Sequence, residues 1–173
     1  MTMAAASTNA QPASLSALRV ALIVVAAIAT LGAIADFPIA FHDFGHKEPL
    51  LVFAQGVTSA RLMIAPLVAG TALTFAAFGR VRYAIMALAA LMFLAWASDL
   101  PTFPIHGLEL SLSTTGAMTF IERFVFPLLA VAAIVLAVRG TKLVLATVFV
   151  TLPMILTITG VVLFAIGIAV HGF

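Results

Sequence analysis

The chain has 173 residues, of which 64% are hydrophobic and 8% charged, and its mean hydropathy is +1.27. These values exclude a soluble domain and indicate an integral membrane protein. The absence of cysteine excludes disulfides, thiolate metal sites and cysteine nucleophiles, and a net charge of only +2 without a run of basic residues gives no support for nucleic-acid binding.

Residues 1–14 are rich in Ala, Ser and Thr and have no apolar periodicity, so we expect a disordered N-terminal tail. Residues 15–173 are interpreted as a single transmembrane domain. Its apolar runs cover 15–36, 50–78, 83–98, 117–138 and 143–170. A bilayer core of about 30 Å needs roughly 20 apolar residues per helix, and lipid cannot satisfy an open backbone. The sequence therefore predicts an all-α integral membrane protein with five transmembrane helices.

The first run has a second interpretation. Arg19 is followed by VALIVVAAIATL and by the small residues AIA before Asp36, a pattern typical of a cleaved signal peptide. We favour a retained helix because the tail before Arg19 is long and because the internal repeat described below needs this helix. Cleavage is kept as the alternative.

Five of the eight basic residues fall on one side of a five-span topology. They are Arg19, Arg80, Arg82, Arg139 and Lys142. The other side receives Asp36, Asp43, Lys47, Glu48, Asp99 and Glu109, together with every histidine. Because cytoplasmic loops carry the excess of Lys and Arg, we expect the N-terminus in the cytoplasm and the C-terminus outside. In a bacterial cell this predicts a multi-pass inner-membrane protein with a polar periplasmic face.

One order of scarce residues occurs twice, at an offset of about 60 residues. The first copy contains Asp36, Pro38, His42, Arg61, Pro66 and the basic turn at 80–82. The second copy contains Asp99, Pro101, His106, Arg123, Pro127 and the basic turn at 139–142. We interpret the copies as a duplicated two-helix hairpin, with repeat 1 at about 15–82, repeat 2 at about 83–142 and a fifth helix at 143–170. Both copies cross the membrane in the same direction, so this parallel repeat differs from an inverted-repeat transporter.

The duplicated arginines are predicted to lie at one depth. Arg61 and Arg123 are roughly 27 and 24 Å along their helices from the cytoplasmic end, near the outer membrane boundary. There they snorkel to lipid headgroups or pair with Asp36 and Asp99. Alternatively, they bind an anionic ligand such as a lipid phosphate or a carboxylate. We expect Glu122 to pair with Arg61, with a proton relay as the alternative, and the candidate polar cluster is Asp36, Arg61, Asp99, Glu122 and Arg123.

Histidines on the predicted outer face are the candidate metal ligands. They are His42, His46, His106 and His171. Zinc and copper sites use three or four ligands, commonly His with carboxylate, so a metal ion at the outer face is a candidate cofactor. Ordinary interfacial histidines are the alternative, because Gly45 and Pro49 disfavour the helix that would hold His42 and His46 on one face. A haem between helices is disfavoured, since no histidine lies inside a span.

The fifth run is too long for the bilayer at roughly 42 Å, so we expect it to tilt, kink at Pro153 or project outward. Gly160 and Gly167 give it a smooth strip, which is a candidate interface with a partner membrane subunit or a second copy of the chain.

These features favour a non-catalytic accessory, assembly or ligand-binding subunit with a polar site at its periplasmic face, embedded in the lipid bilayer. The alternative is a metal- or quinone-dependent redox component that uses His42, His46, His106 and either Asp36 or Asp99, so whether the chain is an enzyme is left open. A small transporter has lower weight, because the middles of the first, third and fifth helices carry no ionisable residue.

Overall fold

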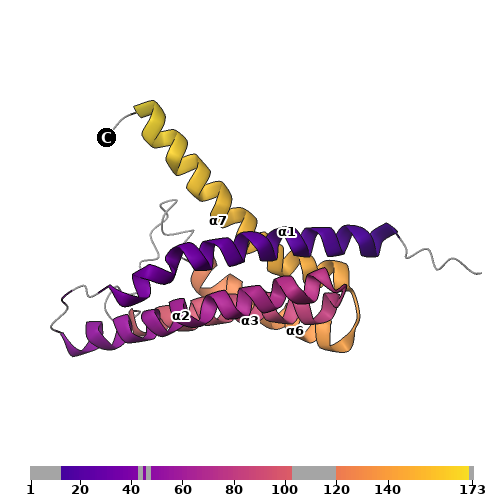
Figure 1. The fold of residues 1–173 in the computed structure, drawn as a ribbon, viewed down its shortest axis with the longest axis horizontal. Helices are drawn as coiled ribbons and strands as arrows, with labels where there is room; N and C mark the ends of the chain where they lie inside the picture. Colours follow the sequence, from indigo (N-terminus) through magenta and orange to yellow (C-terminus); the bar gives the residue numbers. More distant parts are fainter. Residues whose placement is uncertain (1–12, 43–44, 46–47, 103–119, 172–173) are drawn as a thin grey trace, which may run out of the picture.

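A computed structural model describes residues 13–42, 45, 48–102 and 120–171, and over these residues the regular structure is entirely helical (Figure 1). The long helices are α1 (Ala13–Asp36), α2 (Pro49–Ala77), α3 (Val81–Asp99), α6 (Phe126–Arg139) and α7 (Leu143–His171). Two short 3₁₀ helices, η1 (Phe37–Phe41) and η2 (Leu100–Thr102), and a π-helical turn, η3 (Ile121–Val125), complete the elements. The all-α prediction is confirmed, with a helix at each predicted run. The predicted tail lies outside the described residues except for its last two, which begin α1.

Four described segments are long and apolar enough to cross a membrane. They are Ser16–Phe41, Pro49–Ala77, Val81–Asp99 and Ile121–Arg139. A further apolar stretch in α7, Leu143–Leu156, is shorter than a span. The chain therefore has the helices of a multi-pass membrane protein, and a fifth span stays a prediction.

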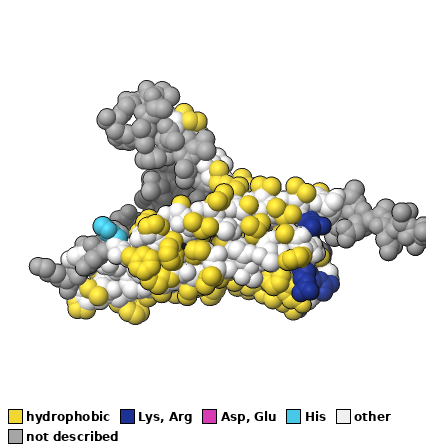
Figure 2. Space-filling view, in the orientation of Figure 1, with side chains coloured by type: hydrophobic (Ala, Val, Ile, Leu, Met, Phe, Trp, Pro, Cys, Tyr) yellow, Lys and Arg dark blue, Asp and Glu magenta, His cyan; other side chains and the backbone are white. Residues whose placement is uncertain are grey.

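The bundle buries small side chains and exposes large ones. On α2 the buried positions are Ala54, Leu62, Ala65, Ala69, Ala72 and Ala76. Leu31, Leu67 and Leu128 are 68%, 73% and 70% exposed, and apolar side chains cover the flank of the bundle seen in Figure 2. Lipid supplies no hydrophobic force between helices, so membrane helices associate through small residues that let their backbones approach. An alanine core inside a coat of Leu, Val and Phe fits that environment.

Five threonine hydroxyls along the helices are satisfied within their own helix. Thr30, Thr71, Thr74, Thr147 and Thr159 each donate to the carbonyl oxygen four residues earlier, at 2.7 to 2.9 Å. Such back-bonding is slightly unfavourable in water. In lipid it provides the hydroxyl with an acceptor that the solvent cannot supply.

Helices α1, α2, α3 and α6 run side by side along the long axis of the molecule (Figure 1). The first half of α7 packs against this bundle, with Ala146, Thr147 and Val150 buried. Beyond it, the second half of α7 leaves the bundle at an angle (Figure 1). Which of the three outcomes expected for the long fifth helix applies in a membrane stays a prediction. The interface predicted at Gly160 and Gly167 stays a prediction.

The two ends of the bundle differ in charge. The end that we name the basic end carries Arg19, Arg80, Arg82, Arg139 and Lys142 on the α1 start and on the α2–α3 and α6–α7 turns. In Figure 2 the Lys and Arg side chains gather there, and a histidine marks the opposite end. That opposite end, which we name the acidic end, carries the described acids Asp36, Glu48, Asp99 and Glu122.

Both turns at the basic end use the same helix stop. Gly79 and Gly140 have φ of +73° and +66°, the left-handed conformation that glycine adopts without steric cost. The amide of the next residue then donates to a carbonyl five residues back: Arg80 to Phe75 at 2.8 Å, and Thr141 to Leu136 at 3.2 Å. These bonds fix both turns, although a stop this common does not establish the predicted duplication.

Candidate functional site

Four charged residues from neighbouring helices converge at the acidic end. Asp99 is the last residue of α3, Glu122 and Arg123 belong to η3, and Arg61 lies within α2. The Asp99 carboxylate is within electrostatic reach of Arg61 and Arg123, and the Glu122 carboxylate is within reach of Asp99 and Arg123. We name Arg61, Asp99, Glu122 and Arg123 the charge cluster.

The two signs of charge differ in exposure within the charge cluster. Asp99 and Glu122 are exposed, whereas Arg61 and Arg123 are half-buried. The Nε of Arg61 is buried and has no hydrogen-bond partner among the described residues. Leaving a buried donor unpaired costs about 1 to 3 kcal/mol. Arg61 therefore holds an N–H for which the described residues offer no hydrogen-bond acceptor.

The local fold of Arg123 follows from Pro127. Proline has no N–H, so the carbonyl of Arg123, four residues earlier, loses its α-helical donor. The chain opens into the π-helical turn η3, in which the amide of Phe126 donates to the carbonyl of Ile121. The indole Nε1 of Trp96 donates to the freed Arg123 carbonyl at 2.8 Å. A side chain of α3 thus replaces the lost backbone bond and fixes Arg123 next to the end of α3.

The end of α3 is itself held in place. Ser98 is 2% exposed, and its hydroxyl lies 2.6 Å from the Ala95 carbonyl oxygen and within hydrogen-bond reach of the Asp99 carboxylate. The Trp96 ring also contacts the Phe93 ring, with 5.1 Å between centroids. Asp99 and Trp96 are therefore positioned by the same turn of α3 that faces η3.

The structure brings together four of the five residues predicted as a polar cluster. Asp36 is exposed at the end of α1, and its charge is not among those that act on Asp99 or Glu122. The expected partner of Glu122 was Arg61, but the charges that act on Glu122 are Asp99 and Arg123. Trp96 was not predicted from the sequence. The available signal was Pro127, which leaves the Arg123 carbonyl without its helical donor.

The predicted metal ligands are only partly described. His42 is exposed after η1, and its backbone carbonyl accepts a hydrogen bond of 3.0 Å from Nε2 of Gln55. His46 and His106 lie outside the described residues, and so does the side chain of His171 at the end of α7. Within the part of the chain that the structure describes, no group of three or more His, Cys, Asp or Glu could hold a metal ion. The metal site stays a prediction.

Comparison with family models, curated proteins and solved structures finds no match. The chemistry of the charge cluster is therefore the guide to function. A guanidinium group offers up to five donors in a planar fork that matches a carboxylate or a phosphate. The exposed carboxylates of Asp99 and Glu122 balance the two guanidinium charges and leave the cluster open to its surroundings. Such a cluster can bind and orient an acceptor-rich group.

Proposed function

We propose that this chain is a non-catalytic subunit of a bacterial inner membrane that binds a carboxylate or phosphate group at its periplasmic end. The charge cluster forms the binding site, and the group bound belongs to a partner membrane subunit or to a small ligand. The observation that carries the proposal is the buried Arg61 Nε, which lies beside Asp99 and has no acceptor among the described residues.

The distribution of charge supports the orientation in this proposal. The basic end carries Arg and Lys without a described acid, and the described acids lie at the other end of the bundle. Under the positive-inside rule the basic end faces the cytoplasm, so the charge cluster faces the periplasm. The N-terminus is then inside, α7 crosses as a fifth span, and the two hairpins are related as parallel repeats.

Binding is favoured over transport by the position of the charge cluster. Arg61 is level with the end of α3 and with η3, at one end of the bundle rather than at its middle. Ion-coupled transporters bind their substrates and coupling ions near the bilayer midplane. A cluster at one end is reached from one side only, as suits an accessory or assembly subunit.

The test compares wild type with Arg61→Gln, using Arg139→Gln at the basic end as the matched loss of one charge. Membranes are extracted in a mild detergent, and the size of the chain is read on native gels. We expect a complex larger than the monomer for wild type and Arg139→Gln, and a shift to monomer for Arg61→Gln. Equal complexes in all variants would place the contact elsewhere.

If wild type runs as a monomer on the native gel, the binding of small ligands is tested next. The purified chain is then heated with succinate or inorganic phosphate as probes of carboxylate and phosphate binding. Binding to the folded state raises the unfolding temperature, and the rise is expected to be absent in Arg61→Gln. A monomer that neither probe stabilises would overturn the proposal.

A further inference from the structure

The basic end holds cations that no described acid neutralises. The described acids Asp36, Glu48, Asp99 and Glu122 all belong to the acidic end. The described basic side chains of Arg19, Arg80, Arg82, Arg139 and Lys142 are all exposed. Like charges at one membrane surface repel one another, so an anion from outside the chain would stabilise this end.

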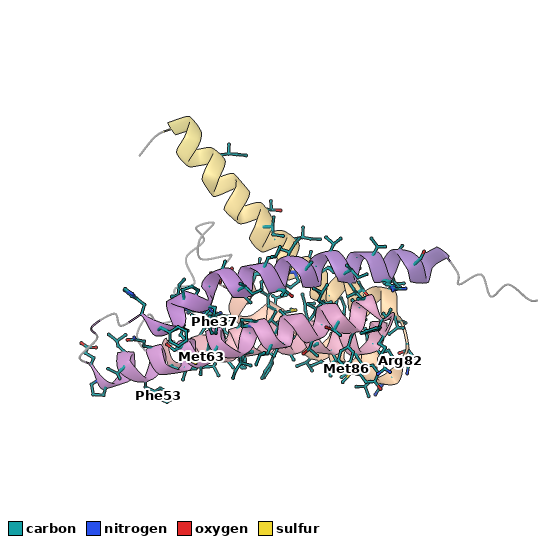
Figure 3. The ribbon with its side chains drawn as sticks, in the orientation of Figure 1. Phe37, Phe53, Met63, Arg82 and Met86 are labelled. Atoms are coloured by element: carbon teal, nitrogen blue, oxygen red, sulfur yellow. The ribbon has the colours of Figure 1, made fainter. Side chains whose placement is uncertain are left out.

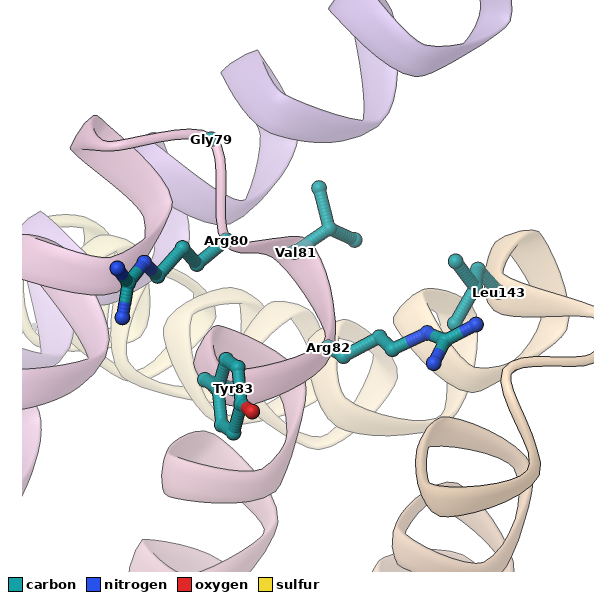
Figure 4. Close-up of a pocket in the computed structure, with 6 residues that line it drawn as sticks. All are labelled: Gly79, Arg80, Val81, Arg82, Tyr83 and Leu143. Carbon is teal, nitrogen blue, oxygen red and sulfur yellow. The ribbon is translucent and has the colours of Figure 1, made fainter.

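Among the described residues the Arg80 side chain has no hydrogen-bond or ion-pair partner, whereas Arg19 and Arg82 each contact the chain. Arg19 donates to the carbonyl of Ala77. The guanidinium of Arg82 lies against Gly140, where an added Cβ would be 1.9 Å from its Nη2. In Figure 4 Arg82 extends toward Leu143, whereas Arg80 extends to the other side of the turn, with the Tyr83 ring between them. The guanidinium of Arg80 is the one directed away from the second turn.

Two surface hollows meet at Arg80. One, of about 490 Å³, is lined by Thr74, Phe75, Phe78 and Arg80. The other, of about 330 Å³, is lined by Gly79, Arg80, Val81, Arg82, Tyr83 and Leu143. Both volumes fall within the roughly 300 to 1,000 Å³ of ligand sites. The first hollow has aromatic walls on the flank of α2, and the second contains arginine and tyrosine at the turn.

The turn between α2 and α3 holds this arrangement rigidly. The amide of Arg80 donates to the carbonyl of Phe75 at 2.8 Å, and Gly79 supplies the left-handed residue that the bond requires. The rings of Phe75 and Tyr83 pack with 5.4 Å between centroids. The backbone of Arg80 and the aromatic pair beside it are therefore fixed before any ligand binds.

We propose that the basic end binds one anionic phospholipid at Arg80. Its phosphate contacts the Arg80 guanidinium, and an acyl chain lies against Phe75 and Phe78. An apolar hollow beside the cation favours a lipid over a free anion, since phosphate alone would leave the aromatic wall uncovered. Phe78 is 77% exposed, which is typical of a side chain that faces acyl chains. This proposal is independent of the charge cluster at the acidic end.

The first test uses native mass spectrometry of the full-length chain in detergent, titrated with phosphatidylglycerol or with phosphatidylcholine. We expect wild type to retain phosphatidylglycerol preferentially. Arg80→Gln should weaken that binding about fivefold, the effect expected for one arginine at an anionic membrane surface. Arg139→Gln removes the same charge from the same end but outside both hollows, and it should retain wild-type binding.

A second variant tests the apolar hollow without touching the charge. Phe78→Ala should weaken phosphatidylglycerol binding, and its exposure means that the core is unaffected. Phe53→Ala is the matched control, because Phe53 is 61% exposed and lies at the other end of the bundle from Arg82 (Figure 3). The proposal is overturned if Arg139→Gln weakens binding as much as Arg80→Gln, if both phenylalanine variants bind like wild type, if phosphatidylcholine binds as well, or if millimolar inorganic phosphate displaces the lipid.

Discussion

The indole Nε1 of Trp96 donates a hydrogen bond of 2.8 Å to the backbone carbonyl of Arg123, across the contact between α3 and η3. The carbonyl is available because Pro127, four residues later, has no N–H to donate. One bond therefore links a helix break to the position of a charged residue. It also joins the two segments that supply Asp99 and Arg123 to the charge cluster.

Trp96→Phe removes the indole donor to the Arg123 carbonyl, so we expect a loss of about 1 to 3 kcal/mol in the free energy of unfolding. Pro127→Ala restores the backbone N–H that an α-helix would use. In that background the cost of Trp96→Phe should fall below about 1 kcal/mol. Unfolding of the four proteins in detergent measures the coupling. An equal cost of Trp96→Phe in both backgrounds would show that the carbonyl is not what the indole stabilises.

The charge cluster predicts a coupling between Arg61 and Asp99. Arg61→Met and Asp99→Asn should together destabilise the chain less than the sum of the single changes, with a coupling of about 0.5 to 3 kcal/mol. Asp36→Asn is the control, because Asp36 is exposed and outside the cluster. Its effect should stay within about 0.5 kcal/mol and add independently to that of Arg61→Met. Coupling of Arg61 to Asp36 as strong as to Asp99 would contradict the observed grouping.

Two glycines of α2 and its turn should respond to alanine with opposite signs. Gly79→Ala places a Cβ at a φ of +73°, which costs about 1 to 2 kcal/mol. Gly70→Ala lies inside α2, where an added Cβ meets nothing within 4 Å. There the change should stabilise by about 0.5 to 1 kcal/mol, because glycine is the poorer helix former. Thermal unfolding of the two variants decides the signs, and a stabilising Gly79→Ala would refute the turn geometry.

The redox alternative makes a separate prediction about bound metal. If His42 and His106 are ligands, the purified chain carries stoichiometric zinc, copper or iron, and His42→Ala combined with His106→Ala removes it. Elemental analysis of both proteins measures this directly. If the wild-type chain purifies without metal or chromophore, the redox hypothesis is excluded and the binding-subunit hypothesis remains.

The helices were predictable from sequence because long apolar runs leave the backbone one way to satisfy its hydrogen bonds in lipid. The charge cluster was largely predictable because charges are scarce in this chain, and counting residues from the basic turns places Arg61 and Arg123 at one depth. The π-helical turn at Arg123 was not predicted. Pro127 predicts that the Arg123 carbonyl loses its backbone donor. The sequence does not predict that Trp96 on a neighbouring helix replaces that donor.

The position of Asp36 shows the limit of estimating membrane depth by counting residues along a helix. Arg19 contacts the carbonyl of Ala77 at the basic end, and Asp36 and Arg61 are nearly the same number of residues from that contact along their helices. The two residues are therefore level. Asp36 is nevertheless exposed, and its charge is not among those that act on Asp99 or Glu122. The number of residues determines how far along a helix a residue lies, but not the direction in which its side chain points.

The most direct measurement is the side of the membrane from which the charge cluster can be reached. The chain has no cysteine, so a single introduced cysteine can be labelled with no background from native cysteines. Leu100→Cys, next to Asp99, and Thr141→Cys, in the turn at the basic end, are both at exposed positions. In intact spheroplasts a membrane-impermeant maleimide should label Leu100→Cys, and Thr141→Cys only after the membrane is opened. Labelling of Thr141→Cys alone in intact spheroplasts would place the charge cluster in the cytoplasm and contradict the account.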